Sequence, residues 1–363
     1  MRIFIHIIIF SLLIQACKKP YDDPPIQESK SCLVVECTIT NEPPPYTVLI
    51  SKSVPYNSNL NPPKITGAII TINDDIGNIE NVIEYPKHSG IYQTLATGMR
   101  GQIGRSYKIK INLQDGKNYE SDWEKINASP TIDSIYADPG QVQYLLQEPD
   151  GTYYVSTKNG MNLHIDFTPF TDQDYYYKVE TNYIQQTEKI IEGALTIYSW
   201  STNTLVFNNG LKASIAEYSA PVKEFFIGFV PEVLIVDSNT ITVSDGEIIN
   251  SSIYSVSKKI YQIFTEENTQ GVPSNSIFDP IPTQLSSNLK CVSDTTQTVF
   301  GYFAAASVVH RYQFFYLQES NDRYLTYNID SIPSGLTPYG VDSVGNGTPM
   351  PKYWFYTFPT KFK

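Results

Sequence analysis

The alternating stretch Tyr107-Lys108-Ile109-Lys110-Ile111-Asn112-Leu113 decides the fold class of this chain. Apolar residues stand at every second position, which is the period of a β-strand with one buried face. Asp115-Gly116 follows, and these residues tolerate the positive φ angles of a tight turn. The chain then continues with Tyr119 and Trp123. The whole segment therefore predicts a β-hairpin.

The same alternation extends from this hairpin towards the N-terminus. It recurs at residues 33–40, 46–50 and 68–72, with turn residues at 73–77 and 86–90. Short strands at this spacing are typical of a β-sandwich. We therefore predict an immunoglobulin-like β-sandwich over residues 31–130, followed by a crossing segment at residues 132–140.

Residues 131–363 are predicted to form a larger β-rich domain, so the fold class is mainly β. Residues 163–168 and 175–180 alternate between apolar and polar side chains, and further strands are expected at 299–309 and 312–317. Between residues 252 and 268 the period changes. Ile253, Val256, Ile260, Ile263 and Phe264 recur at steps of three and four, which predicts one amphipathic helix near 252–268.

The N-terminal residues 1–16 have the pattern of a cleavable signal peptide. An apolar run over residues 3–14 follows Arg2 and is shorter than the roughly 20 residues needed to span a bilayer. Ala16-Cys17 matches a lipobox, which predicts cleavage before Cys17 and a covalent lipid on its thiol; the alternative is an apolar segment with an incidental cysteine. Residues 17–30 are polar and contain prolines, as expected of a flexible tether.

The charge of the chain limits its possible partners, and its cysteine content limits its possible disulfide bonds. The 26 basic residues are outnumbered by 37 acidic ones, which gives a net charge of −11. Basic residues form no run longer than a pair such as Lys18-Lys19, so no nucleic-acid partner is expected. Besides Cys17, the chain contains Cys32, Cys37 and Cys291. Cys32 and Cys37 are too far apart on one strand to bridge. Cys291 could pair with either, although small buried thiols are the favoured interpretation.

No catalytic motif is present in the sequence. It contains neither a His-Glu-x-x-His zinc motif nor a Gly-x-Ser-x-Gly nucleophile elbow. His164 and Asp166 share one face of a predicted strand and could pair, but an exposed polar face explains the same residues. We therefore expect no enzymatic activity, no metal site and no cofactor other than the lipid on Cys17.

Aromatic residues are the other unusual feature, with 27 tyrosines and 17 phenylalanines. Tyrosine favours strands, so most should pack across neighbouring strands. The candidate exposed interface is the terminal run Tyr353, Trp354, Phe355 and Tyr356. Exposed aromatic residues could equally form a sugar platform, and the scattered carboxylates could act on glycans. A surface glycan-binding or glycan-processing lipoprotein is therefore an alternative function.

Several segments, in order along the chain, resemble a Bacteroidota outer-membrane lipoprotein family, the domain of unknown function 4249. Cys37 stands where this family usually has glycine, and a cysteine pair often found near the family's C-terminus is missing. The matching segments are residues 33–41, 45–48, 67–74, 104–111, 115–117, 278–283, 287–288 and 301–303.

The resemblance implies an outer-membrane lipoprotein that works beside a TonB-dependent transporter and has no assigned enzymatic activity. Asp22 and Asp23 follow the lipidated cysteine and form a candidate surface-export signal, so the cell surface is expected over the periplasmic face. The leading hypothesis is a non-catalytic accessory or binding subunit of an outer-membrane β-barrel. That barrel is a TonB-dependent transporter or part of a larger assembly or secretion complex. A structural envelope protein is a further alternative.

Overall fold

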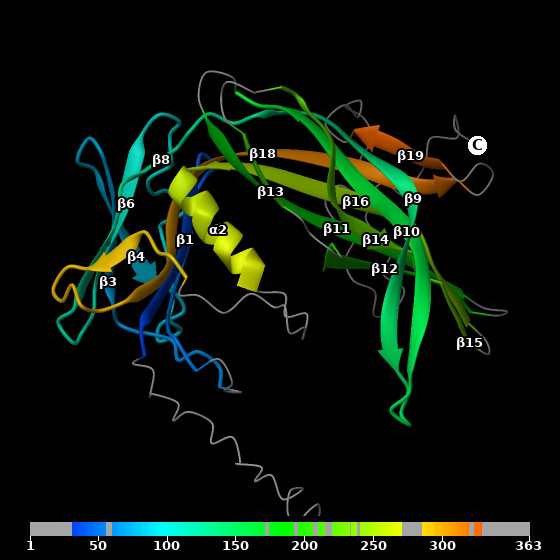
Figure 1. Cartoon of the computed structure of the whole chain (residues 1–363), viewed down its shortest axis with the longest axis horizontal. Helices are drawn as coiled ribbons and strands as arrows, with labels where there is room; N and C mark the ends of the chain where they lie inside the picture. Colours follow the sequence, from blue (N-terminus) through cyan, green and yellow to red (C-terminus); the bar gives the residue numbers. More distant parts are fainter. Residues whose placement is uncertain are drawn as a thin grey trace, which may run out of the picture.

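The computed structural model describes residues 31–55, 60–170, 174–191, 195–205, 210–214, 220–232, 234–237, 240–270, 285–318 and 323–328. Within these ranges the chain forms nineteen β-strands and one α-helix (Figure 1). The predicted mainly β fold class, with one helix in the C-terminal part, is confirmed.

The N-terminal module is a sandwich of short strands around one apolar core. The alternating stretch beginning at Tyr107 lies in β6, and its Tyr107, Ile109 and Ile111 are at most 1% exposed. The predicted hairpin follows, with Gly116 at φ +84° in its turn. The strands are β1 (Leu33–Thr40), β2 (Thr47–Lys52), β3 (Ile69–Asp74), β4 (Ile79–Glu84), β5 (Ile91–Gln93), β6 (Ser106–Asn112), β7 (Asn118–Ser121) and β8 (Glu124–Lys125).

Two strands from the C-terminal part of the chain complete this sandwich. β17 (Leu289–Cys291) pairs with β7, and the first half of β18 (Val299–Gln318) runs parallel to β1. Gly301 makes the parallel approach possible, because it has φ +83° and a Cβ there would lie 2.0 Å from the carbonyl oxygen of Val35. The core predicted within residues 31–130 therefore includes residues far beyond them.

The remaining strands form two layers that face each other across a second apolar core. β9, β10 and β14 make a three-stranded sheet, which packs on the sheet containing β11, β16 and the second half of β18. Figure 1 shows β18 passing from the N-terminal sandwich into this second part. The strands are β9 (Thr131–Gln147), β10 (Tyr153–Thr168), β11 (Tyr175–Ile191), β12 (Leu195–Thr204), β13 (Leu211–Ser214), β14 (Val222–Pro231), β15 (Leu234–Asp237), β16 (Thr240–Val256) and β19 (Arg323–Asn328).

Two strands, β9 and β18, differ from what the sequence predicted. The crossing segment expected at residues 132–140 is the first half of the 17-residue strand β9. The two strands expected at 299–309 and 312–317 are one continuous strand, β18. Polar residues within these two strands look like strand ends in the sequence. The strands nevertheless continue through them, because pairing with β10 and β16 provides hydrogen-bond partners for the backbone at these positions.

The helix begins later than the periodicity predicted. It is α2 (Lys258–Gln270), whereas Ile253 and Val256 belong to β16. β16 lies between β11 and β18 and buries both of its faces, so apolar residues at odd and even positions imitate a helical period. Ile253 packs in the second core, while Val256 packs with Ile260 in a third cluster under α2.

A buried polar junction joins the N-terminal sandwich, α2 and the segment before β17. The Asn288 side-chain amide donates to Glu124 Oε1 and to the Phe303 carbonyl, both at 2.8 Å. Ser257 caps α2, since its Oγ accepts the Ile260 N–H at 3.2 Å, and the nearby Ser257 side chain contributes to lowering the pKa of Glu124. Burial raises the pKa of Glu124 despite these hydrogen bonds. The junction thus brings together three segments that are distant in sequence, and a hydrogen bond between Asn288 and Glu124 lies at its centre.

Candidate functional site

The site residues named from the sequence fall outside the described part of the chain. Cys17, Asp22 and Asp23 precede it, and Tyr353, Trp354, Phe355 and Tyr356 follow it. The lipid anchor, the export signal and the terminal aromatic edge therefore remain predictions. Among the described residues, no helix is both long and apolar enough to cross a membrane.

The three cysteines of the described chain are free thiols. Cys37 and Cys291 are buried, and Cys32 is partly exposed. Burial raises the pKa of the Cys37 thiol. Cys291 Sγ lies 3.4 Å from Ser293 Oγ at the end of β17. Neither bridge left open by the sequence, from Cys291 to Cys32 or to Cys37, is formed, and the two buried thiols pack as small apolar side chains.

His164 and Asp166 lie on one face of β10, as predicted, and both contact Tyr136 and the Glu224 backbone. The His164 ring stacks on Tyr136 with centroids 5.4 Å apart. Asp166 accepts hydrogen bonds from the Glu224 N–H at 2.8 Å and from Lys223 Nζ at 3.1 Å. Burial raises the pKa of Asp166, yet these donors outweigh it and leave the pKa below its ordinary value. The arrangement is a hydrogen-bonded polar sheet face, but it is less exposed than the sequence suggested, because the side chains of His164 and Asp166 are only 19% and 15% exposed.

A relay of three polar side chains joins the two parts of the molecule. His310 on β18 lies 2.7 Å from Ser252 Oγ on β16 and 2.7 Å from Glu42 Oε1 in the loop after β1. The residue types resemble a nucleophilic triad. However, Ser252 sits in mid-strand directly opposite Glu180, so an oxyanion formed there would face a carboxylate instead of donors. The relay is therefore better suited to holding the two parts together than to catalysis.

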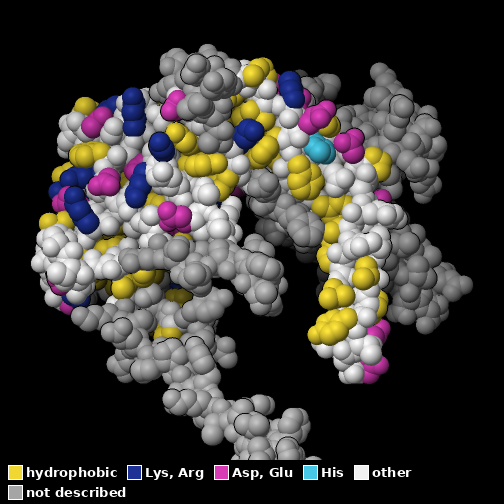
Figure 2. Space-filling view, in the orientation of Figure 1, with side chains coloured by type: hydrophobic (Ala, Val, Ile, Leu, Met, Phe, Trp, Pro, Cys, Tyr) yellow, Lys and Arg dark blue, Asp and Glu magenta, His cyan; other side chains and the backbone are white. Residues whose placement is uncertain are grey.

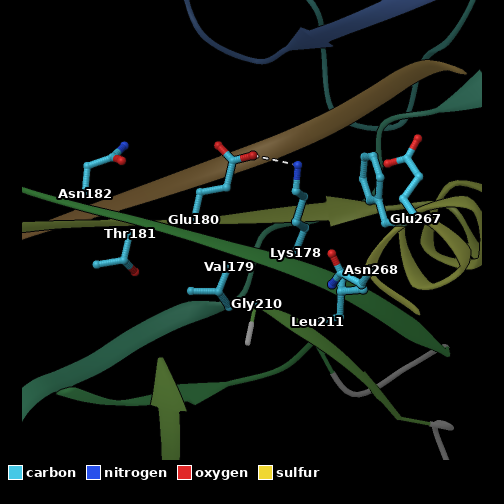
Figure 3. Close-up of a pocket in the computed structure, with 10 residues that line it drawn as sticks. Lys178, Val179, Glu180, Thr181, Asn182, Gly210, Leu211, Glu267 and Asn268 are labelled. Carbon is cyan, nitrogen blue, oxygen red and sulfur yellow. Dashed lines mark ion pairs between the residues drawn. The ribbon is translucent and has the colours of Figure 1, made fainter. Parts of the chain in front are cut away.

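The described residues line one pocket beside α2, with a volume of about 300 Å³. Figure 3 shows Lys178, Glu180 and Asn182 projecting from one face of β11, with Glu267 of α2 nearby. Lys178 and Glu180 form an ion pair at 2.7 Å (Figure 3). The complete set of lining residues is Lys178, Val179, Glu180, Thr181, Asn182, Gly210, Leu211, Phe264, Glu267 and Asn268.

The pocket's charged groups are already engaged with one another. Lys178 Nζ also lies 4.3 Å from the centroid of the Phe264 ring, a cation–π contact. Burial raises the pKa of Glu267, and nearby Lys178 offsets this only in part. The set offers donors and acceptors for a small polar ligand. Because Lys178 is paired with Glu180, we interpret the pocket as a binding site.

Metal binding finds no support in the described ranges. No group of three or more histidine, cysteine, aspartate and glutamate side chains is placed there to hold an ion. Asp74, one half of the Asp74-Asp75 pair, instead accepts hydrogen bonds from the Ile76 and Asn78 N–H groups within a turn. This is the role of a turn aspartate.

A group of exposed apolar residues lies on a ribbon formed by β9 and β10. β14 pairs with β10 only from Gly160 to Phe167, and the two strands continue beyond this sheet as a two-stranded ribbon that projects from the body (Figure 1). Figure 2 shows apolar side chains along the ribbon and acidic ones at its end. The exposed apolar residues are Leu145 (67%), Leu146 (40%), Tyr153 (63%), Tyr154 (46%) and Val155 (60%).

From the sequence, most tyrosines were expected to pack across neighbouring strands, and the ribbon with its exposed Tyr153 and Tyr154 was missed. The available signal was the loss of alternation, because consecutive apolar residues stand on both sides of the turn at Pro149-Asp150-Gly151. Consecutive apolar residues in a strand place side chains on both faces. The exposure of both faces could not be predicted from the sequence, because it depends on the position at which β14 ends in the structure.

Comparison with known proteins identifies the family of this chain. Residues 18–311 match the family model described as domain of unknown function (DUF4249), which spans most of the chain. No curated protein and no solved structure matches the sequence. The chain therefore belongs to the family described as the domain of unknown function 4249.

Proposed function

We propose that this protein is a non-catalytic, lipid-anchored binding subunit of an outer-membrane β-barrel, either a TonB-dependent transporter or a larger assembly or secretion complex. The observation that carries the proposal is the projecting β9–β10 ribbon. Its five exposed apolar side chains are contiguous along the ladder. Exposed apolar patches of this kind mark interaction sites in soluble proteins.

The rest of the chain is consistent with this role. The signal-peptide pattern and Cys17 support attachment to the outer membrane, and Asp22 and Asp23 support display on the cell surface. The polar relay and the pocket lack the arrangement that acyl transfer requires. The net charge of −11 favours a protein or polar ligand over nucleic acid.

The test is purification of the tagged full-length chain from native membranes in mild detergent. We expect a β-barrel in stoichiometric amount with the wild type. The variant Leu145→Ser/Val155→Ser should lose the barrel, because it removes the apolar contact. Ile76→Ser/Ile79→Ser is a matched control, since these residues are equally exposed in the N-terminal sandwich. Isolation of the wild type as a lone monomer, or full retention of the barrel by the ribbon variant, contradicts the proposal.

Location is tested separately by treating intact cells with protease. Degradation of the chain without lysis supports the cell surface. Protection until the outer membrane is opened supports the periplasmic face.

The pocket beside α2 supports a second candidate function, binding of a small glycan. Its volume of about 300 Å³ is at the lower end of the range of roughly 300–1,000 Å³ seen for ligand sites. Its carboxylates and amides suit hydroxyl groups. A rise in melting temperature with mono- or disaccharides, abolished by Asn182→Ala, would support this function. No rise across a broad sugar panel would remove it.

A further inference from the structure

The end of the β9–β10 ribbon carries apolar side chains on both faces. Directly paired residues of an antiparallel ladder point to the same side. Val155 lies opposite Leu145, which defines one face, and Tyr154 lies opposite Leu146, which defines the other. A flat partner surface could cover only one of these two pairs. Burial of both requires a partner that encloses the ribbon.

The ribbon also presents two unpaired strand edges in the described structure. Residues 153–158 of β10 form a ladder only with residues 142–147 of β9, because the last backbone hydrogen bond on the β14 side joins Glu232 N–H to the Asn159 carbonyl. In hydrocarbon, each unpaired N–H and C=O group of these edges would cost several kcal/mol. A protein partner can instead supply a strand or side chains to them. The edges therefore favour a protein over a lipid environment.

The turn at the end of the ribbon is acidic and preformed. Glu148 and Asp150 are exposed there, and the Thr152 hydroxyl and N–H lower the pKa of Asp150. Glu148 N–H donates to the Thr152 carbonyl at 2.8 Å, and Gly151 N–H donates to the Glu148 carbonyl at 2.9 Å. These charges would enter a bilayer first and deepest, which is costly. They suit a partner surface with positive charge.

From these observations we infer that the ribbon inserts into a cleft of a protein partner, with apolar walls on both sides and lysine or arginine side chains at its floor. This inference rests on the proposed function as a binding subunit and specifies the chemistry of the contact. The lipid on Cys17 would hold the chain at the membrane, while the ribbon would select the partner.

The test is photo-crosslinking in native membranes with the full-length chain. Benzoylphenylalanine is placed singly at Val155 on one face and at Leu146 on the other, with Ile76 as an equally exposed control position. We expect both ribbon positions to crosslink the same protein, at peptides from two separate wall segments, and Ile76 to give no such adduct. Adducts to lipid, or adducts from one face only, overturn the inference.

Charge is tested in the same experiment. Glu148→Lys/Asp150→Lys should lower the adduct yield by about tenfold or more, because it places cations against a basic floor. Asp115→Lys/Asp122→Lys makes the same charge change at exposed positions outside the ribbon and should leave the yield unchanged. An equal yield from the ribbon variant overturns the basic floor. A crosslinked cleft that belongs to a protein other than a β-barrel would uphold this inference while contradicting the proposed function.

Discussion

Replacing Asn288 by alanine should strongly destabilise the junction between the N-terminal sandwich and α2. Asn288 is 3% exposed, and its amide donates to Glu124 Oε1 and to the Phe303 carbonyl, while its Oδ1 accepts the Phe303 N–H at 3.0 Å. Truncation leaves three buried polar groups without this partner. Each such group costs about 1–3 kcal/mol, so the free energy of unfolding should fall by at least roughly 3 kcal/mol.

Equilibrium unfolding in urea measures this loss, with tryptophan fluorescence as the signal because Trp123 lies beside Glu124 in the chain. The slope of the transition should not change, since the native fold is kept. Asn81→Ala is the control. Asn81 is exposed on β4, and its loss should cost less than about 0.5 kcal/mol. A loss below about 1 kcal/mol for Asn288→Ala would refute the view that these hydrogen bonds hold the junction.

The remaining predictions concern one carboxyl group, one glycine and the thiols. Burial raises the folded-state pKa of Glu124, so the stability that this group contributes is present below its unfolded-state pKa and is lost as the pH rises through its folded-state pKa. In urea unfolding, Glu124→Gln should therefore be as stable as the wild type near pH 4 and more stable than the wild type at pH 8. Equal stabilities at pH 8 would contradict this prediction. Gly301→Ala should lower the free energy of unfolding by about 3 kcal/mol, because the new Cβ clashes with a backbone oxygen in addition to the strain of a positive φ. Gly77 also has a positive φ but has open space around a Cβ, so Gly77→Ala should lower the free energy of unfolding by only about 1 kcal/mol. Equal losses of stability in thermal unfolding would contradict the clash at Gly301. A thiol reagent added to the folded protein should label Cys32 before the buried Cys37 and Cys291, as peptide mapping can show, and early labelling of Cys37 would contradict its burial.

Local patterning was sufficient wherever a strand has one buried and one exposed face. Tyr107, Ile109 and Ile111 were placed in the core by their period of two alone, and the turn at Gly116 was predicted from residue type. The same reasoning misplaced the start of α2, because a strand buried on both faces has no alternation to recognise. Ile253 and Val256 are apolar for two different cores, and only the helix cap at Ser257 separates them from α2.

By itself, the sequence determined the mainly β class, the positions of β1, β2, β3 and β6 in the N-terminal sandwich, and the family to which the chain belongs. Each of these depends on short-range features: residue type, period and the order of segments along the chain. The tertiary structure alone decided that β18 completes the sandwich, that Asn288 meets Glu124, and that the β9–β10 ribbon extends beyond β14. These are contacts between residues far apart in sequence, and their apolar or polar types are compatible with many partners. The choice among those partners is made when the layers pack together, and it leaves the two apolar faces of the ribbon exposed.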